Sequence, residues 1–212
     1  MEADAGVIHG GDWVAAVDEV EVQLERLLTR GSLEEQLHGS SALAGRSPDA
    51  ILHRGSGWGA LEQLRREQSG EPAFCSTALA FDADGLTNDQ APWISLVRQG
   101  ALPECDVSHD PGAWMVQEEW LVLLEDSLQV QGGDHWIARL HLGLMYYARG
   151  DVDAAGATWE ESLRRRPSGW AYRNLAALNK LAGRQAEAIR QYSAAIKMLP
   201  HVRHLLVEYC EY

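Results

Sequence analysis

The stretch WIARLHLGLMYYARGDVDAAGATWEESLRRRPS, residues 136–168, is followed directly by GWAYRNLAALNKLAGRQAEAIRQYSAAIKMLPH, residues 169–201. The second stretch repeats the chemical pattern of the first at a spacing of 33 residues. The corresponding positions are Leu142 and Leu175, Gly143 and Ala176, Gly150 and Gly183, Ala155 and Ala188, Trp159 and Tyr192, Ser162 and Ala195, and Pro167 and Pro200. A pattern that recurs at a fixed period of this length indicates a repeated supersecondary unit.

Within each copy, small residues stand where two helices and a tight turn require them. Gly143 and Ala176 allow the first helix to approach its partner closely, because they carry little or no side chain. Gly150 and Gly183 fall where a tight turn between helices favours a residue without a Cβ atom. Asp151 follows the first of these glycines and is placed to cap the second helix. Each copy is therefore predicted to be a pair of helices joined by a short turn.

Bulky and helix-ending residues complete the pattern. Trp159 and Tyr192 come one turn after a small alanine and are predicted to fill the space between the helices. Pro167 and Pro200 end the second helix of each copy. The arginines at 164–166 complement the negative C-terminal end of that helix, so we interpret them as helix-end charges and not as a nucleic-acid patch.

These features resemble the tetratricopeptide repeat (TPR) family. The matching residues are Leu142, Gly143, Tyr146, Ala155, Trp159 and Pro167 in the first copy and Tyr172, Leu175, Ala176, Ala188, Tyr192, Ala195 and Pro200 in the second. Two positions depart from the family pattern: Arg139 stands where the family often has tryptophan, and Asn179 replaces a tyrosine. The resemblance covers the two 33-residue copies and implies stacked helical hairpins. Residues 201–212 have the apolar spacing of a helix that caps the last hairpin.

In the TPR family, the first helix of each repeat lines a concave groove. Carried over by position, the groove residues are Ile137, Leu140, Leu144 and Tyr147, then Trp170, Arg173, Ala177 and Lys180. The family's clamp for a peptide carboxylate is not assembled, because Leu140 and Leu144 stand where it needs polar side chains. A mixed apolar groove with two cations suits an amphipathic or extended acidic and apolar segment of a protein partner. The alternative left open is that the preceding part of the chain fills this groove.

Residues 1–131 are predicted to form a helical region with irregular loops, and residues 132–212 to hold two TPR-like repeats and the capping helix. Apolar spacing and capping residues predict helices over residues 13–28, 58–68, 87–99 (opening with a Thr87/Gln90 cap) and 112–129. The first of these looks like the second helix of a repeat whose first helix is missing, which favours descent from a longer ancestral protein. The predicted fold class is all-α, a short TPR-type helical-hairpin solenoid with an irregular helical N-terminal region.

The segments LHRGSGWGALE, DQAPWISL, WMVQEEWLVLLEDSL and GGDHWIARLHLGLM carry a second resemblance. They are similar to the C-terminal region of large bacterial proteins that join a sugar-binding type of β-sandwich to TPR repeats, in a domain of unknown function. The sandwich is not part of this sequence. A carbohydrate link is therefore implied by the resemblance alone, with no residue assigned to a sugar.

The glycine-rich stretch HRGSGWGALE, residues 53–62, contains the candidate ligand loop Gly55, Ser56, Gly57, Trp58 and Gly59. Its glycine order lacks the dinucleotide spacing G-x-G-x-x-G, and no GK[ST] follows. One interpretation is a bend that lets Trp58 pack between helices as the next helix begins. The other is a helix N-terminus that holds a small ligand.

Charge and cysteine usage restrict the classes of partner. The 18 Lys and Arg residues against 31 Asp and Glu residues give a formal net charge of −13, which argues against nucleic-acid binding. No signal peptide or membrane span is visible, and the odd number of cysteines, three, favours reduced thiols in a cytoplasmic protein.

No catalytic, cofactor or metal site is predicted. His201 and His204 share a helix face but have no acidic or cysteine ligand nearby in sequence. Cys105 and His109 lack a third group that would orient them as a nucleophile pair. We therefore expect a non-catalytic TPR-type protein–protein interaction or scaffold module. The alternative is an accessory region of a carbohydrate-active system whose sandwich domain is elsewhere.

Overall fold

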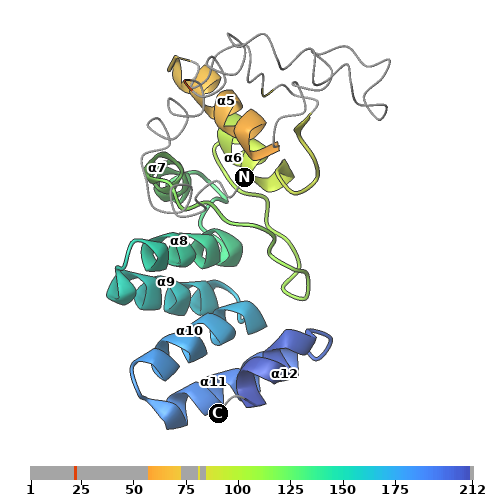
Figure 1. The fold of residues 1–212 in the computed structure, drawn as a ribbon, viewed down its shortest axis with the longest axis vertical. Coiled ribbons are helices and arrows are strands. Elements are labelled where there is room, and N and C mark those ends of the chain that lie inside the picture. Colours follow the sequence, from red (N-terminus) through yellow and green to blue (C-terminus); the bar gives the residue numbers. More distant parts are fainter. Residues whose placement is uncertain (1–21, 23–56, 73–80, 82–84, 211–212) are drawn as a thin grey trace. The chain divides into compact units, whose positions relative to one another are not determined.

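The structure is a computed structural model that describes residues 22, 57–72, 81 and 85–210. In these residues the fold is all-α, with no strand (Figure 1). The helices are α5 (Gly57–Ser69), α6 (Ala91–Gln99), α7 (Glu118–Ser127), α8 (Trp136–Ala148), α9 (Val152–Arg165), α10 (Gly169–Leu181), α11 (Gln185–Met198) and α12 (Arg203–Cys210). None of the described helices combines the length and the apolar character needed to cross a membrane. The helix predicted over residues 13–28 lies outside the described residues.

The chain divides into two compact units, Met1–Ala91 and Pro92–Tyr212. In the first unit, α5 begins one residue before the predicted helix and ends one residue after it. The predicted contact between Thr87 and Gln90 is present, because the Gln90 side-chain oxygen accepts hydrogen bonds from the backbone and the hydroxyl of Thr87. The helix predicted over residues 87–99 is nevertheless wrong in its first four residues, since α6 begins only at Ala91 and residues 88–90 form a turn. The second unit holds α7 to α12 and nearly all of α6. The predicted boundary after residue 131 falls inside this unit, between α7 and α8.

Two helical hairpins, α8–α9 and α10–α11, form the centre of the second unit and stack in chain order (Figure 1). Gly150 and Gly183 form the turns with φ of 81° and 71°, a left-handed conformation that favours glycine. The predicted cap is confirmed, since the Asp151 side chain accepts a hydrogen bond from the backbone N–H of Ala154 at 3.0 Å. The local pattern therefore predicted both hairpin turns at the correct residues.

Trp159 fills the space between α8 and α9, as the sequence predicts. It is buried, and its indole N–H donates to the Leu140 carbonyl at 3.0 Å. A Cβ atom added at Gly143 would lie 2.3 Å from the indole nitrogen, so only glycine fits beneath this ring. Tyr192 is buried in the second hairpin in the same register. The core around these hairpins comprises Trp136, Ile137, Leu140, Ala155, Trp159, Trp170, Ala171, Leu175, Leu178, Ala195, Leu199 and Leu205.

The helix predicted over residues 112–129 is wrong in its first six residues, because α7 begins only at Glu118. Gly112 adopts a left-handed φ of 78°, and its N–H bonds the Asp110 carboxylate in a turn. The carbonyls of Pro111 and Ala113 accept hydrogen bonds from aromatic rings elsewhere in the unit. These bonds hold the backbone extended, and they are long-range contacts that helical spacing does not reveal.

Candidate functional site

The predicted groove residues range from buried to exposed. Ile137, Leu140 and Trp170 are buried, Leu144, Arg173 and Ala177 are half-buried, and Tyr147 and Lys180 are exposed. The buried members belong to the core between the hairpins, so their side chains are not open to a partner in this conformation. The surface that remains is the C-terminal half of α8 and the middle and end of α10.

A segment of the chain itself lies against the N-terminal half of α8. Residues 101–116, which we name the strap, run as an extended loop between α6 and α7 and past α8 (Figure 1). The Trp136 indole N–H donates to the Cys105 carbonyl at 3.1 Å. Cys105 and Val107 pack against the hydrophobic core that contains the buried groove residues. The strap is therefore bound through its backbone and through apolar side chains, since Leu102 and Met115 are also buried.

Two histidines of α8 and its N-cap also donate to strap carbonyls. His135 Nε2 lies 2.9 Å from the Leu102 carbonyl oxygen, while its Nδ1 accepts the Ala138 backbone N–H and so caps α8. His141 Nε2 lies 3.1 Å from the Pro111 carbonyl oxygen. Because a carbonyl can only accept, each ring must carry its proton on Nε2. Both histidines therefore act as Nε2 donors that fix the strap.

His141 is the more deeply buried of the two. Its ring packs edge-on against Trp93 at 5.3 Å between centroids, and its Nδ1 has no hydrogen-bond partner in the described structure. Burial lowers the pKa of His141 to about 4. The imidazole is consequently neutral at pH 7, as a donor to a carbonyl and a neighbour of an apolar ring should be.

Charged contacts secure the edges of the same region. Asp134 accepts hydrogen bonds from Arg139 at 2.8 Å and from Arg165 at 2.5 Å, which lower the pKa of its carboxyl group and join the start of α8 to the end of α9. Arg166 lies 3.7 Å from Glu104 and 3.9 Å from Asp106 in the strap. The arginines at 165 and 166 therefore make structural ion pairs, in agreement with their interpretation as helix-end charges.

The second hairpin is covered by a different segment, the short helix α12. Arg173, a predicted groove residue, donates from Nη2 to Glu208 Oε1 at 2.7 Å and from Nε to Glu208 Oε2 at 2.9 Å. This bidentate pair raises the pKa of Arg173. Leu205 is fully buried in the core, and Tyr209 contacts Tyr192 with 6.4 Å between ring centroids.

The contacts that hold α12 contribute less free energy than those of a longer, more buried helix would. Leu205 is the one fully buried residue of its eight, and burying a leucine contributes about 1.5–3 kcal/mol. The side chains of Arg173 and Glu208 are 36% and 27% exposed, so their ion pair contributes roughly 0–1 kcal/mol. The eight-residue helix is also too short to be stable away from this surface.

The described part of the candidate ligand loop lies against protein atoms. A Cβ atom added at Gly57 would lie 2.5 Å from the Gly85 carbonyl oxygen, and one at Gly59 would lie 2.4 Å from the Phe81 ring. These glycines therefore permit a close approach of α5 to neighbouring backbone and ring atoms. Trp58 is half-buried, and Gly55 and Ser56 lie outside the described residues.

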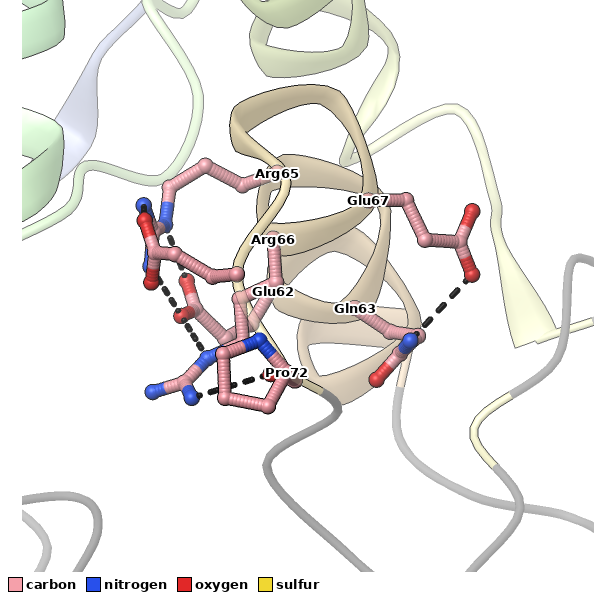
Figure 2. A network of polar contacts seen from close by, with 7 residues as sticks. Glu62, Gln63, Arg65, Arg66, Glu67 and Pro72 are labelled. Carbon is pink, nitrogen blue, oxygen red and sulfur yellow. Dashed lines mark hydrogen bonds and ion pairs between the residues drawn. The ribbon is translucent and has the colours of Figure 1, made fainter.

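A partly buried ion-pair network occupies the end of α5 (Figure 2). Arg65 donates to both carboxylate oxygens of Glu62 and to both of Glu71, and Arg66 donates to Glu62 and to the Pro72 carbonyl. The hydrogen bonds from Arg65 lower the pKa of Glu71. Each charge of Arg65, Glu62 and Glu71 is met by an opposite one, so the network stabilises the turn after α5.

Among the described residues, the cysteine and metal-ligand candidates do not form a catalytic or metal site. Burial, together with Asp106 and Glu104, raises the pKa of the Cys105 thiol, which disfavours the reactive thiolate. No three His, Cys, Asp or Glu side chains in the described parts of the chain come together as metal ligands.

Sequence reasoning missed the residues that hold the two covering segments. These are His135, Trp136 and His141 on the strap side and Glu208 on the α12 side. One signal was present: His135 and Ser168 lie 33 residues apart, and both cap the first helix of their hairpin. Extending the repeat by one residue would have found the caps, but not the strap.

Comparisons with known proteins add no relative. No protein-family model, no curated protein and no solved structure matches this chain.

Proposed function

We propose that this protein is a TPR-type, non-catalytic interaction module that binds an acidic and apolar protein segment on α10. One observation carries the proposal: Arg173, at a groove position of the repeat pattern, already holds the carboxylate of an apolar helical segment, α12. The two hairpins have glycine turns and buried aromatic residues, Trp159 and Tyr192, at the same repeat positions, which supports their assignment as TPR repeats. The carbohydrate-linked alternative stays a prediction from resemblance.

The experiment is peptide selection on the full chain, run with and without Glu208→Gln, which removes the carboxylate that pairs with Arg173. A phage library of random dodecapeptides should yield sequences rich in Asp or Glu and in Leu, because the α10 surface offers the cations Arg173 and Lys180 beside apolar side chains. Arg173→Ala with Lys180→Ala should abolish the binding of these sequences. Lys197→Ala, which removes an exposed cation of α11, is the matched control and should leave binding unchanged.

Selection of no acidic and apolar sequence, or equal binding by the double variant, would contradict the proposal. The stability of each variant is measured in parallel by thermal unfolding. Lys180 and Lys197 are exposed, so replacing either one should change the free energy of unfolding by about 0.5 kcal/mol or less.

A further inference from the structure

The α12 helix differs from a simple end cap in its outer face. A terminal helix that only shields a repeat stack presents polar side chains to water. In α12, however, Leu206 and Val207 are 46% and 59% exposed, next to the fully buried Leu205. Apolar side chains thus lie on both the inner and the outer side of this eight-residue helix.

The contacts beneath α12 form a recognisable pattern. Leu205 enters the core, and Glu208, three residues later, pairs with Arg173 of α10. Tyr209 then lies against Tyr192 of α11. Residues three apart lie on the same face of a helix, so Leu205 and Glu208 face the hairpin together and the adjacent Tyr209 contacts it beside them. All three contacts use side chains and none uses the backbone of α12, so another helix with the same pattern could make them.

We propose that α12 is a displaceable occupant of the α10–α11 surface, and that this surface binds in trans an amphipathic helix carrying leucine, a carboxylate three residues later and an aromatic residue after it. This inference rests on the proposed function and specifies the partner's chemistry. Because α12 is tethered by only Leu199 to Val202, it competes at high effective concentration. A partner therefore binds the intact chain only to the extent that α12 is released.

The test uses the full chain and a fluorescein-labelled peptide of residues 203–210, RHLLVEYC, with Cys210→Ser. Binding is measured by fluorescence anisotropy to the unmodified chain and to two variants that release α12: Glu208→Arg alone, and Glu208→Arg with Leu205→Asp. We expect each variant to bind the peptide at least about tenfold more tightly than the unmodified chain does. The single variant keeps every buried residue, so it tests the inference even where the double variant does not fold.

A charge exchange identifies the site. The peptide with Glu208→Arg should lose about tenfold in affinity for the released chain, because two cations then face each other. A full chain with Arg173→Glu should restore the binding of that peptide. Arg190→Glu, on an exposed part of α11, is the matched control and should restore nothing.

Equal binding of the peptide by intact and released chains would overturn the inference, because α12 would then not occupy the peptide's site. Absence of binding to all chains would also overturn it. Neither result decides the proposed function, which fails only where peptide selection yields no Arg173-dependent sequence. A released chain could also form a concentration-dependent dimer and bind no peptide. The occupant of the surface would then be a second copy of this chain, which contradicts the inference.

Discussion

The two hairpins are covered in opposite ways. The strap lies on α8 through three ring N–H groups that donate to backbone carbonyls, and those rings are themselves buried. The α12 helix is held through side chains: the fully buried Leu205, the partly exposed Glu208 paired with Arg173 of α10, and Tyr209 against Tyr192 of α11. The first hairpin thus carries a segment that is held by backbone hydrogen bonds in addition to side-chain packing, and the second carries a segment whose described contacts with the hairpin are made by side chains.

This difference has a functional consequence. Carbonyl groups are common to all peptides, so the α8 contacts do not select a sequence, and the burial of their donors makes them costly to break. The contacts of α12 depend instead on the side chains of a leucine in the core, a carboxylate paired with Arg173 of α10 and an aromatic ring against Tyr192 of α11. We therefore interpret the first covered surface as structural, and the second is the one for which we propose partner recognition.

The largest expected effect is on the first hairpin itself. Trp159→Ala should lower the free energy of unfolding by about 3–5 kcal/mol, because it opens a cavity above Gly143 and removes the donor to the Leu140 carbonyl. Chemical denaturation measures this loss. Tyr147→Ala, which truncates an exposed ring beside Trp159, should cost about 1 kcal/mol or less. An unchanged midpoint for Trp159→Ala would refute the packing of α9 on α8.

The pH dependence of stability tests the fixed strap. In the unfolded chain His141 is protonated below its ordinary pKa of about 6.5, whereas in the fold its pKa is about 4. The unfolded state therefore binds more protons in this window, and stability should fall by about 2–3 kcal/mol as the pH drops from 7 to 4.

His141→Gln isolates this effect, because its amide can still donate to Pro111 but does not titrate in the window. The difference in unfolding free energy between the two proteins should shrink as the pH falls. The same slope in both proteins would show that His141 is not buried against the strap.

A smaller effect is expected where only the strap is loosened. Trp136→Phe removes the donor to the Cys105 carbonyl and shortens a fully buried ring, so it should cost about 2 kcal/mol. In a Cys75→Ser background, thiol labelling of Cys105 should accelerate about fivefold, while that of the exposed Cys210 stays constant. Trp114→Phe, in the exposed part of the strap, is the control and should change neither rate. Equal labelling in Trp136→Phe and the parent would mean that this bond does not hold the strap.

The smallest effect on global stability is expected at α12. Glu208→Gln should cost about 0.5 kcal/mol or less, because its pair with Arg173 is partly exposed. Glu161→Gln, which removes an ion pair with Arg164 within α9, is the control of similar size. A loss of several kcal/mol for Glu208→Gln alone would show that α12 is an integral part of the fold.

The sequence predicted those features that depend on local pattern. Gly150, Asp151 and Trp159 act within one hairpin, and the repeat spacing identifies all three. The extended backbone before α7 was not predictable, because the ring donors that hold Pro111 and Ala113 lie 30 and 20 residues away in sequence.

The candidate surface shows the same limit. Its position on α10 followed from the TPR resemblance, which placed Arg173 among the groove residues. Its occupancy did not follow, because Glu208 is 35 residues away and no pattern links the two. Long-range contacts between a repeat and a covering segment require the fold itself.

Hydrogen exchange of the intact chain tests most directly whether the second surface is exchangeable. Backbone amides of α12 should exchange through a local opening, at a free energy well below that of α10 amides, which should exchange only on global unfolding. Glu208→Gln should speed the α12 amides alone. Equal protection of α12 and α10 would contradict the account, since α12 would then leave its surface only when the whole unit unfolds.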